Sequence, residues 1–267
     1  MQNEKLVAQA FGKQAMVFDS MYGNDTIIQY KRERVRAHVS ALLKPHSHIL
    51  ELNAGTGEDA IWFARQGHTV HATDIAAGML NILGNKVHQS GLHGAITHEL
   101  CSYTSLGKLV EQGPYDHVFS NFAGLNCTNE LNKVLNALSP LVKKNGTVTM
   151  VILPKFCLWE FLLLAKGKIR TALRRFGGKN GTRSHVEGVW FNCWYYDPEY
   201  VKKLMPSDFT HLQTEGLCSF VPPSYIVGFA EKYPRFYALL KKWEAKYGSS
   251  RPWRSIGDYY IISFRKA

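Results

Sequence analysis

The sequence predicts an α/β fold, a doubly wound and mostly parallel sheet of seven strands with helices on both faces. Between residues 47 and 153, short apolar runs alternate with helical patterns of about ten residues, which is typical of βαβ units and a parallel sheet. A bend with the pattern Gly-x-Gly lies at residues 55–57, between an apolar run and a helical pattern. Right-handed crossovers then place helices on both faces of the sheet.

Each element is predicted from its local pattern. Residues 1–45 are expected to be helical, because Val35, Val39 and Leu42 recur at helical spacing and Pro45 ends the segment. Helical patterns follow the first, second and fourth predicted strands. The seven apolar runs that predict strands are residues 47–52, 68–74, 95–100, 115–121, 145–153, 211–220 and 258–266.

The alternation also sets the expected organisation of the chain. It stops after Pro154, and residues up to the sixth strand form an insertion with a predicted basic helix at 159–176, a glycine-rich turn at 177–181 and an aromatic, strand-like run at 189–196. We therefore expect one domain with four parts. These are an N-terminal helical lid at 1–45, a half that carries the Gly-x-Gly bend at 46–153, an inserted cap at 154–209, and C-terminal strands that complete the same sheet at 210–267.

The amino-acid composition limits the classes of protein to which this chain can belong. A content of 45% hydrophobic residues excludes a disordered chain. The 32 Lys and Arg against 21 Asp and Glu give a net charge of +11, which can attract nucleic acid, an anionic membrane or an acidic substrate. Five scattered cysteines form no Cys-x-x-Cys pair, so no metal site or disulfide framework is predicted, and we expect a cytoplasmic protein. Pro154, Lys155 and Glu160 interrupt the longest apolar stretch, so no transmembrane span is expected.

The bend and the acids around it indicate a class of ligand. Residues 55–60 fit G-x-G-x-x-A, a dinucleotide fingerprint, and Asp74 ends the next predicted strand, where an acid suits ribose hydroxyls. A pyrophosphate at the helix N-terminus would lie against Glu58 and Asp59 and near Glu51. Like charges about 5 Å apart cost several kcal/mol at an effective dielectric constant of about 20. The acids therefore favour a cationic ligand without phosphate, although acids are common in any first helical turn.

These motifs resemble the class I S-adenosylmethionine-dependent methyltransferases of the small-molecule type, over about residues 15–153 and more loosely at the end of the chain. The family's first motif, E/D-x-G-x-G-x-G, appears as ELNAGTG at residues 51–57, with Asn53 in place of the first glycine. Among non-glycine residues, Asn best tolerates left-handed backbone angles, so the turn can still form. The resemblance implies a Rossmann-like methyltransferase fold with an antiparallel last strand, and S-adenosylmethionine as cofactor.

The resemblance also implies which residues contact that cofactor. Asp74 would accept from the ribose hydroxyls, Ile75 would pack on the adenine, and Glu51 would hold the amino group. In the lid, Tyr22 and Arg32 are the candidates to close over the cofactor and pair with its carboxylate. A solvated helix face is the alternative for Arg32, because Lys31, Arg34 and Arg36 share its segment. The full set of expected cofactor-binding residues is Tyr22, Arg32, Glu51, Asn53, Ala54, Gly55, Gly57, Asp74, Ile75, Met79, Cys101, Ser102, Asn121 and Phe122.

The insertion is expected to supply the acceptor pocket, because the cofactor half is common to all such enzymes. Trp190, Tyr195 and Tyr196 are the candidates to wall a flat or apolar acceptor, with ordinary core packing as the alternative. His185 is the candidate general base for an acceptor that must lose a proton. The basic stretch at residues 166–183 has three interpretations: a solvated face, a surface for anionic lipid, and a contact for an acidic substrate or carrier protein.

We therefore predict an enzyme that transfers a methyl group from S-adenosylmethionine to O, N or C of a small, hydrophobic or aromatic metabolite. Nucleic acid is disfavoured as a partner, because residues 120–123 read Ser-Asn-Phe-Ala where base amino-methyltransferases carry N/D-P-P-Y/F. One alternative is an NAD(P)-dependent oxidoreductase that uses the fingerprint at 55–60. The other is a non-catalytic module that binds RNA or an anionic membrane through the basic charge.

Overall fold

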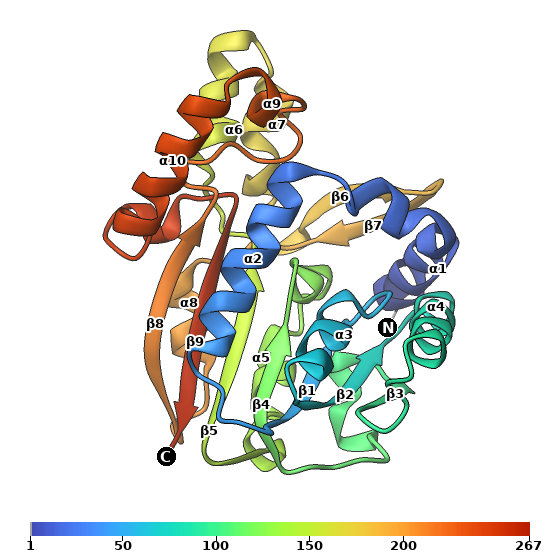
Figure 1. The fold of residues 1–267 in the computed structure, drawn as a ribbon. Helices are drawn as coiled ribbons and strands as arrows, with labels where there is room; N and C mark the ends of the chain where they lie inside the picture. Colours follow the sequence, from blue (N-terminus) through green and yellow to red (C-terminus); the bar gives the residue numbers. More distant parts are fainter. Residues whose placement is uncertain (1) are drawn as a thin grey trace.

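The computed structural model describes residues 2–267, and its central layer is a seven-stranded sheet in the order β3-β2-β1-β4-β5-β9-β8 (Figure 1). The first five strands pair in parallel, whereas β9 pairs antiparallel with both β5 and β8. The predicted strands and the antiparallel last strand are thus confirmed. The strands are β1 (His48–Leu52), β2 (Thr69–Asp74), β3 (Ile96–Leu100), β4 (Tyr115–Ser120), β5 (Val142–Ile152), β8 (Phe209–Leu217) and β9 (Tyr259–Lys266).

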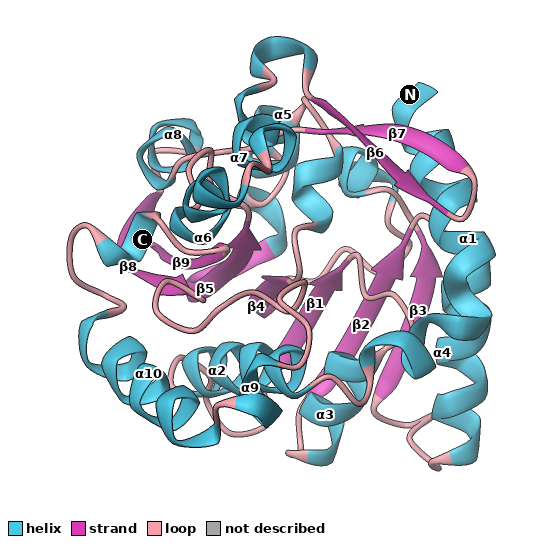
Figure 2. Cartoon of the chain, turned by 90° about the horizontal axis from the view of Figure 1, so that it is seen from above, coloured by secondary structure: helices cyan, strands magenta, loops and turns pink. Residues whose placement is uncertain are grey.

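Helices cover both faces of the sheet, which is why the parallel strands read as continuous apolar runs. Seen from above, α2 and α3 lie on one side of the sheet, and α5 and α8 lie on the other (Figure 2). The helices are α1 (Gln2–Tyr22), α2 (Thr26–Ser40), α3 (Glu58–Arg65), α4 (Ala77–Gln89), α5 (Leu131–Asn136), α6 (Leu158–Leu162), α7 (Ile169–Leu173), α8 (Pro198–Leu204), α9 (Phe229–Lys232) and α10 (Pro234–Tyr247). Among the described residues, none of the helices combines the length and the hydrophobicity that a membrane span requires.

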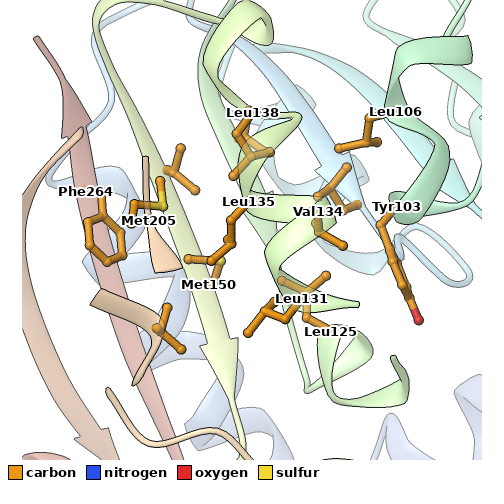
Figure 3. Packing of buried hydrophobic residues seen from close by; sticks show 14 of the residues in the cluster. Tyr103, Leu106, Leu125, Leu131, Val134, Leu135, Leu138, Met150, Met205 and Phe264 are labelled. Carbon is orange, nitrogen blue, oxygen red and sulfur yellow. The ribbon is translucent and has the colours of Figure 1, made fainter. Parts of the chain in front are cut away.

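Alternate residues of each strand enter two separate cores. Leu50 of β1 packs with α5 and α8, while its neighbour Ile49 packs with α2, α3 and α4. Figure 3 shows the first core, where Leu131 and Leu135 of α5 lie against Met150 of β5. All three side chains are at most 2% exposed. The sheet is therefore held rigidly from both sides, and its strand ends are fixed in position.

The predicted basic helix at residues 159–176 is not continuous. The segment forms two short helices, α6 and α7, with 3₁₀ turns after each, and Gly167 has a left-handed φ of 71° between them. Ile169, Leu173 and Phe176 are each more than half exposed. A long helix draws its stability from burying an apolar stripe, and the apolar residues here face solvent instead.

Two further parts of the chain differ from the expected organisation. Helix α10 lies between β8 and β9, where only strands were expected, although Pro234 at its first turn and the buried stripe of Tyr237 and Leu240 are helix signals. Helix α8 falls inside the predicted cap, but its Val201 is fully buried in the core under β9. The cap above the sheet therefore comes from two segments rather than one.

The aromatic run of the insertion is a strand only in its first part. β7 (Val189–Cys193) pairs antiparallel with β6 (Thr182–Val186) in a separate two-stranded sheet. Phe191 on the inner face of this hairpin packs 5.9 Å, ring centroid to ring centroid, from Phe11 of α1. The hairpin and α1 therefore support each other at the edge of the sheet where β3 lies, as Figure 1 shows.

Candidate functional site

A cavity of about 850 Å³, part of it open to solvent, lies at the carboxyl ends of β1, β2 and β4, under α1 and α2. This is the point where the strand order reverses from β1, and doubly wound sheets bind their ligands there. Most of the expected cofactor residues line this cavity: Arg32, Glu51, Asn53, Ala54, Gly55, Asp74, Ile75, Met79, Cys101, Asn121 and Phe122.

The bend after β1 is built from left-handed residues. Asn53, Gly55 and Gly57 have φ values of 49°, 58° and 80°. The side chain of Asn53 donates to the carbonyl oxygen of Asn121 at 2.9 Å and accepts from Ser120 Oγ at 2.6 Å. Through these two hydrogen bonds, the asparagine that replaces the first glycine of the motif links the end of β1 to the end of β4.

Gly57 shapes the bend without lining the cavity. A Cβ atom there would lie 2.6 Å from Leu83 Cγ of α4, so only glycine allows the bend to approach that helix. At Gly55 a Cβ would meet no atom within 4 Å. The two glycines thus have different tasks, close packing at Gly57 and an open approach to the cavity at Gly55.

Glu51 is a buried carboxylate that faces the cavity and lacks a complete set of partners. The residue is 2% exposed, and its Oε2 has no hydrogen-bond partner among the described residues. Burial, and then the charge of Asp59, raise the pKa of Glu51 well above its ordinary value. Burying an ionised carboxylate without a partner costs free energy. A bound cation would supply that partner for Glu51.

Asp59 is also buried, but its charge is compensated. Its carboxylate receives hydrogen bonds from Arg32 Nη1 at 3.0 Å, Arg36 Nε at 2.8 Å and Asn121 Nδ2 at 2.7 Å. Burial opposes ionisation, but the two guanidinium groups outweigh it, so the pKa of Asp59 is lowered. Of the acids expected to select the ligand, Asp59 is therefore neutralised from within the protein.

Glu58 also has a cationic partner, a lysine that it shares with Asp19. Its carboxylate pairs with Lys86 Nζ of α4 at 2.6 Å, in a largely exposed position. The electrostatic preference predicted for the bend consequently rests on Glu51 and Asp74 and not on the two acids that follow Gly57. Asp74 accepts from the backbone N–H of Gly55 and of Ala76, both at 2.8 Å. Burial raises the pKa of Asp74, and these hydrogen bonds act in the opposite direction.

Arg32 and Phe122 form one wall of the cavity. The guanidinium carbon of Arg32 lies 5.1 Å from the ring centroid of Phe122, within the range of a cation–π contact. Nε of Arg32 is buried and has no partner among the described residues. Phe122 and Ala123 have positive φ values of 45° and 62°, which is a strained conformation for residues with a Cβ.

Two expected residues lie just outside the cavity, and a neighbour of each lines it instead. Tyr22 packs edge-on against Phe18, one turn earlier on α1, with ring centroids 4.8 Å apart, and Phe18 lines the cavity. Ser102 caps the following 3₁₀ helix by accepting from Thr104 N at 3.2 Å, and the adjacent Tyr103 lines the cavity. The lining also includes Val7 and Phe11 of α1, which recur at helical spacing.

The residues expected at the acceptor do not line the cavity. His185 is exposed on the outer face of the β6–β7 hairpin, with its ring centroid 4.6 Å from that of Trp190. Tyr196 is buried in the core and donates to the backbone oxygen of Thr128. The guanidinium carbon of Arg175 lies 5.4 Å from the ring centroid of Tyr195. Strand alternation places His185 and Trp190 on the face turned away from α1.

Comparisons with known proteins agree with this architecture. Residues 49–146 match the family model described as "Methyltransferase domain". No curated protein matches the sequence. The chain resembles the solved structure of magnesium protoporphyrin IX methyltransferase from Synechocystis PCC 6803 with bound S-adenosylhomocysteine, at 16% identity and a TM-score of 0.61, over 99% of this chain and 100% of that chain.

Two other solved structures show how widely this fold is used. One is 1,6-didemethyltoxoflavin-N1-methyltransferase from Burkholderia thailandensis, at 13% identity and a TM-score of 0.57, over 98% of this chain and 88% of that chain. The other is the [4+2]-cyclase SpnF, at 17% identity and a TM-score of 0.62, over 97% of this chain and 94% of that chain. Residues 49–146 thus match a methyltransferase domain model, and the chain has the Rossmann-like fold of these solved structures.

Proposed function

We propose that this chain binds S-adenosylmethionine in the cavity at the ends of β1, β2 and β4 and transfers its methyl group to a small molecule. The proposal rests mainly on Glu51, whose buried Oε2 has no hydrogen-bond partner among the described residues and faces the cavity. Asp74, at the end of the neighbouring strand, is a second acid of the cavity without a cationic partner among the described residues. The carboxylate of Glu51 suits an ammonium group, and that of Asp74 suits the two hydroxyls of a ribose. A pyrophosphate would oppose both of them.

Each end of the ligand has a matching part of the cavity in this proposal. Glu51 holds the ammonium, and Arg32, whose Nε is free, holds the carboxylate. Asp74 is already oriented by the N–H groups of Gly55 and Ala76 and keeps lone pairs for the ribose hydroxyls. The adenine lies among the apolar lining residues Ile75, Met79 and Phe11.

When bound, the cofactor supplies an electrophilic methyl group on a sulfonium. The task of the protein is then to hold the acceptor in line with that group and to exclude water, and such positioning can supply most of the acceleration. The apolar side chains that α1 places over the cavity, Phe11 and Phe18, serve the exclusion of water. The ring of Phe122, which already has the guanidinium carbon of Arg32 at 5.1 Å from its centroid, forms part of the cavity wall beside that group.

The acceptor in this proposal is a small, hydrophobic or aromatic metabolite. This assignment draws support from the solved structures of the same fold, which include methyltransferases for magnesium protoporphyrin IX, 1,6-didemethyltoxoflavin and geranyl diphosphate. His185 lies on the exposed face of the hairpin, so its contacts do not support the role of general base. An acceptor atom that is already nucleophilic needs no base.

Titration calorimetry with S-adenosylmethionine and S-adenosylhomocysteine tests the proposal. Both ligands should bind, and Asp74→Asn, which keeps one acceptor oxygen, should weaken binding roughly tenfold or more through loss of a charge-assisted hydrogen bond. Glu130→Gln, at a carboxylate that does not line the cavity, is the matched control. Absence of binding for both ligands, or saturable binding of NADH in their place, would overturn the assignment.

A further inference from the structure

The positive charge of the chain is concentrated in the cap above the sheet. We define the cap as residues 154–181, between β5 and β6, together with residues 218–258, between β8 and β9. These segments hold 14 of the 32 basic residues but only 4 of the 21 acidic ones, so they carry +10 of the net charge of +11. The remainder of the chain is close to neutral. The basic excess is thus a property of one part of the molecule.

The acids of the cap do not offset this charge at its surface. Glu160 and Asp258 are buried and bonded to Arg175. Glu244 is buried and accepts from backbone N–H groups of residues 219–221. Only Glu231 is exposed, and it accepts a hydrogen bond from Thr26. In contrast, Lys166, Lys168, Arg170 and Lys179 form no ion pair with any described residue.

The same surface exposes large apolar side chains. Of the 19 large hydrophobic residues that are exposed in the described chain, 12 lie in the cap, although the cap is about a quarter of the sequence. Ile169 is 60% exposed and lies between Lys168 and Arg170. Scattered exposed apolar residues are ordinary, but a concentration of them marks a surface that contacts a partner or a membrane.

Helix α10 repeats the combination of apolar and basic residues. Phe236, Leu239, Trp243 and Tyr247 follow at helical spacing, and each is between 39% and 47% exposed. A neighbouring stripe of the helix carries Arg235, Lys242 and Lys246, which also recur at helical spacing. Interfacial helices combine an apolar stripe with Lys and Arg beside it, and Trp and Tyr favour the level of lipid headgroups.

The two segments of the cap lie at the same end of the molecule, as Figure 1 shows for α6, α7, α9 and α10. They are joined by the guanidinium of Arg174 over the ring of Tyr225, at 5.7 Å, and by the bond from Arg175 to Asp258 at 2.8 Å. We propose that this cap docks on an anionic lipid bilayer, with its exposed apolar side chains among the headgroups and its lysines and arginines against the lipid charge. The proposal is independent of the proposed function.

Co-sedimentation with vesicles tests this surface. The protein should bind vesicles of phosphatidylcholine and phosphatidylglycerol but not vesicles of phosphatidylcholine alone, and binding should weaken as salt rises. Lys166→Glu with Lys168→Glu should lower the partition coefficient on the order of tenfold or more. Lys133→Glu with Lys144→Glu, the same charge change at exposed lysines outside the cap, should lower it much less.

A second pair of variants separates lipid insertion from simple charge attraction. Ile169→Ser should weaken vesicle binding several-fold at any salt concentration, whereas Val110→Ser, at an 89% exposed position outside the cap, should not change it. An unchanged far-UV circular dichroism spectrum would show that each variant is folded. Absence of binding to anionic vesicles would overturn the proposal. A dimer that Ile169→Ser dissociates would assign it to a second copy of this chain.

Discussion

Two buried charge clusters in this molecule differ in how completely their polar atoms are paired. One lies at the base of the cap, where Arg175 donates to Glu160 Oε1 at 2.5 Å, to Asp258 Oδ1 at 2.8 Å and to the backbone oxygen of Pro154 at 3.2 Å. Lys31 Nζ lies 3.5 Å from the second oxygen of Asp258. Every buried polar side-chain atom of Arg175, Glu160 and Asp258 has a partner among the described residues.

The cavity cluster has the same kinds of groups in a different state. Asp59 is compensated by Arg32 and Arg36, but Glu51 beside it keeps an unpaired oxygen, and Arg32 keeps an unpaired Nε. Burial is similar in the two clusters, so burial alone does not mark a binding site. The closed cluster therefore supports the fold, while the open one has capacity for a ligand with both charges.

The largest expected effect comes from breaking the closed cluster. Arg175→Met removes the one cation that contacts both Glu160 and Asp258, so it should lower the free energy of unfolding by about 3–5 kcal/mol. Urea denaturation measures this change. Arg170→Met, at an exposed arginine that forms no ion pair with a described residue, is the control and should leave the unfolding free energy nearly unchanged. A loss below about 1 kcal/mol at Arg175 would show that the cluster is not structural.

The open cluster should respond in the opposite way. Glu51→Gln replaces a buried carboxyl group whose Oε2 has no partner among the described residues, so it should not destabilise the protein, but it should weaken S-adenosylmethionine binding roughly tenfold. Calorimetry and urea denaturation of the same variant separate the two effects. If affinity and stability fell together, Glu51 would belong with the structural acids and the contrast between the clusters would fail.

The same variant has a predicted pH dependence. The pKa of Glu51 is raised above its ordinary value of 4.5 in the folded state. The free energy of unfolding should therefore fall as the pH rises from 4.5 through the pKa of Glu51 in the folded protein. Glu51→Gln lacks this decrease, and its unfolding free energy should therefore exceed that of the wild type by a margin that grows over this range. Wild-type affinity for S-adenosylmethionine should rise over the same range, because the ammonium pairs with the ionised carboxylate.

The smallest effect is expected at the rim of the closed cluster. Arg174 also bonds Glu160, but its side chain is 41% exposed, so the pair is screened by water. Arg174→Gln should lower the free energy of unfolding by about 0–1 kcal/mol. A cost comparable to that of Arg175→Met would mean that exposure does not distinguish the two arginines.

Backbone requirements made much of the fold and the cavity predictable. The apolar period and the Asn53, Gly55 and Gly57 bend depend on neighbours in sequence, because burial on both sheet faces and left-handed turns are local properties. The expected position of Asp74 followed from the same local order. Phe18 could have been found from the spacing of Val7 and Phe11 on α1, whereas Tyr22 was favoured only by its residue type.

The order of the strands along the chain, the bend and the acids at the strand ends are all predictable from the sequence, since each depends on a short-range pattern. Which acids lack a cationic partner depends instead on contacts that form when the chain folds. Arg32 and Arg36 reach Asp59 from another helix, and Lys86 reaches Glu58 from a third, so no local pattern could separate these acids from Glu51. Ionic compensation and surface exposure depend on residues that are distant in sequence and become neighbours when the chain folds.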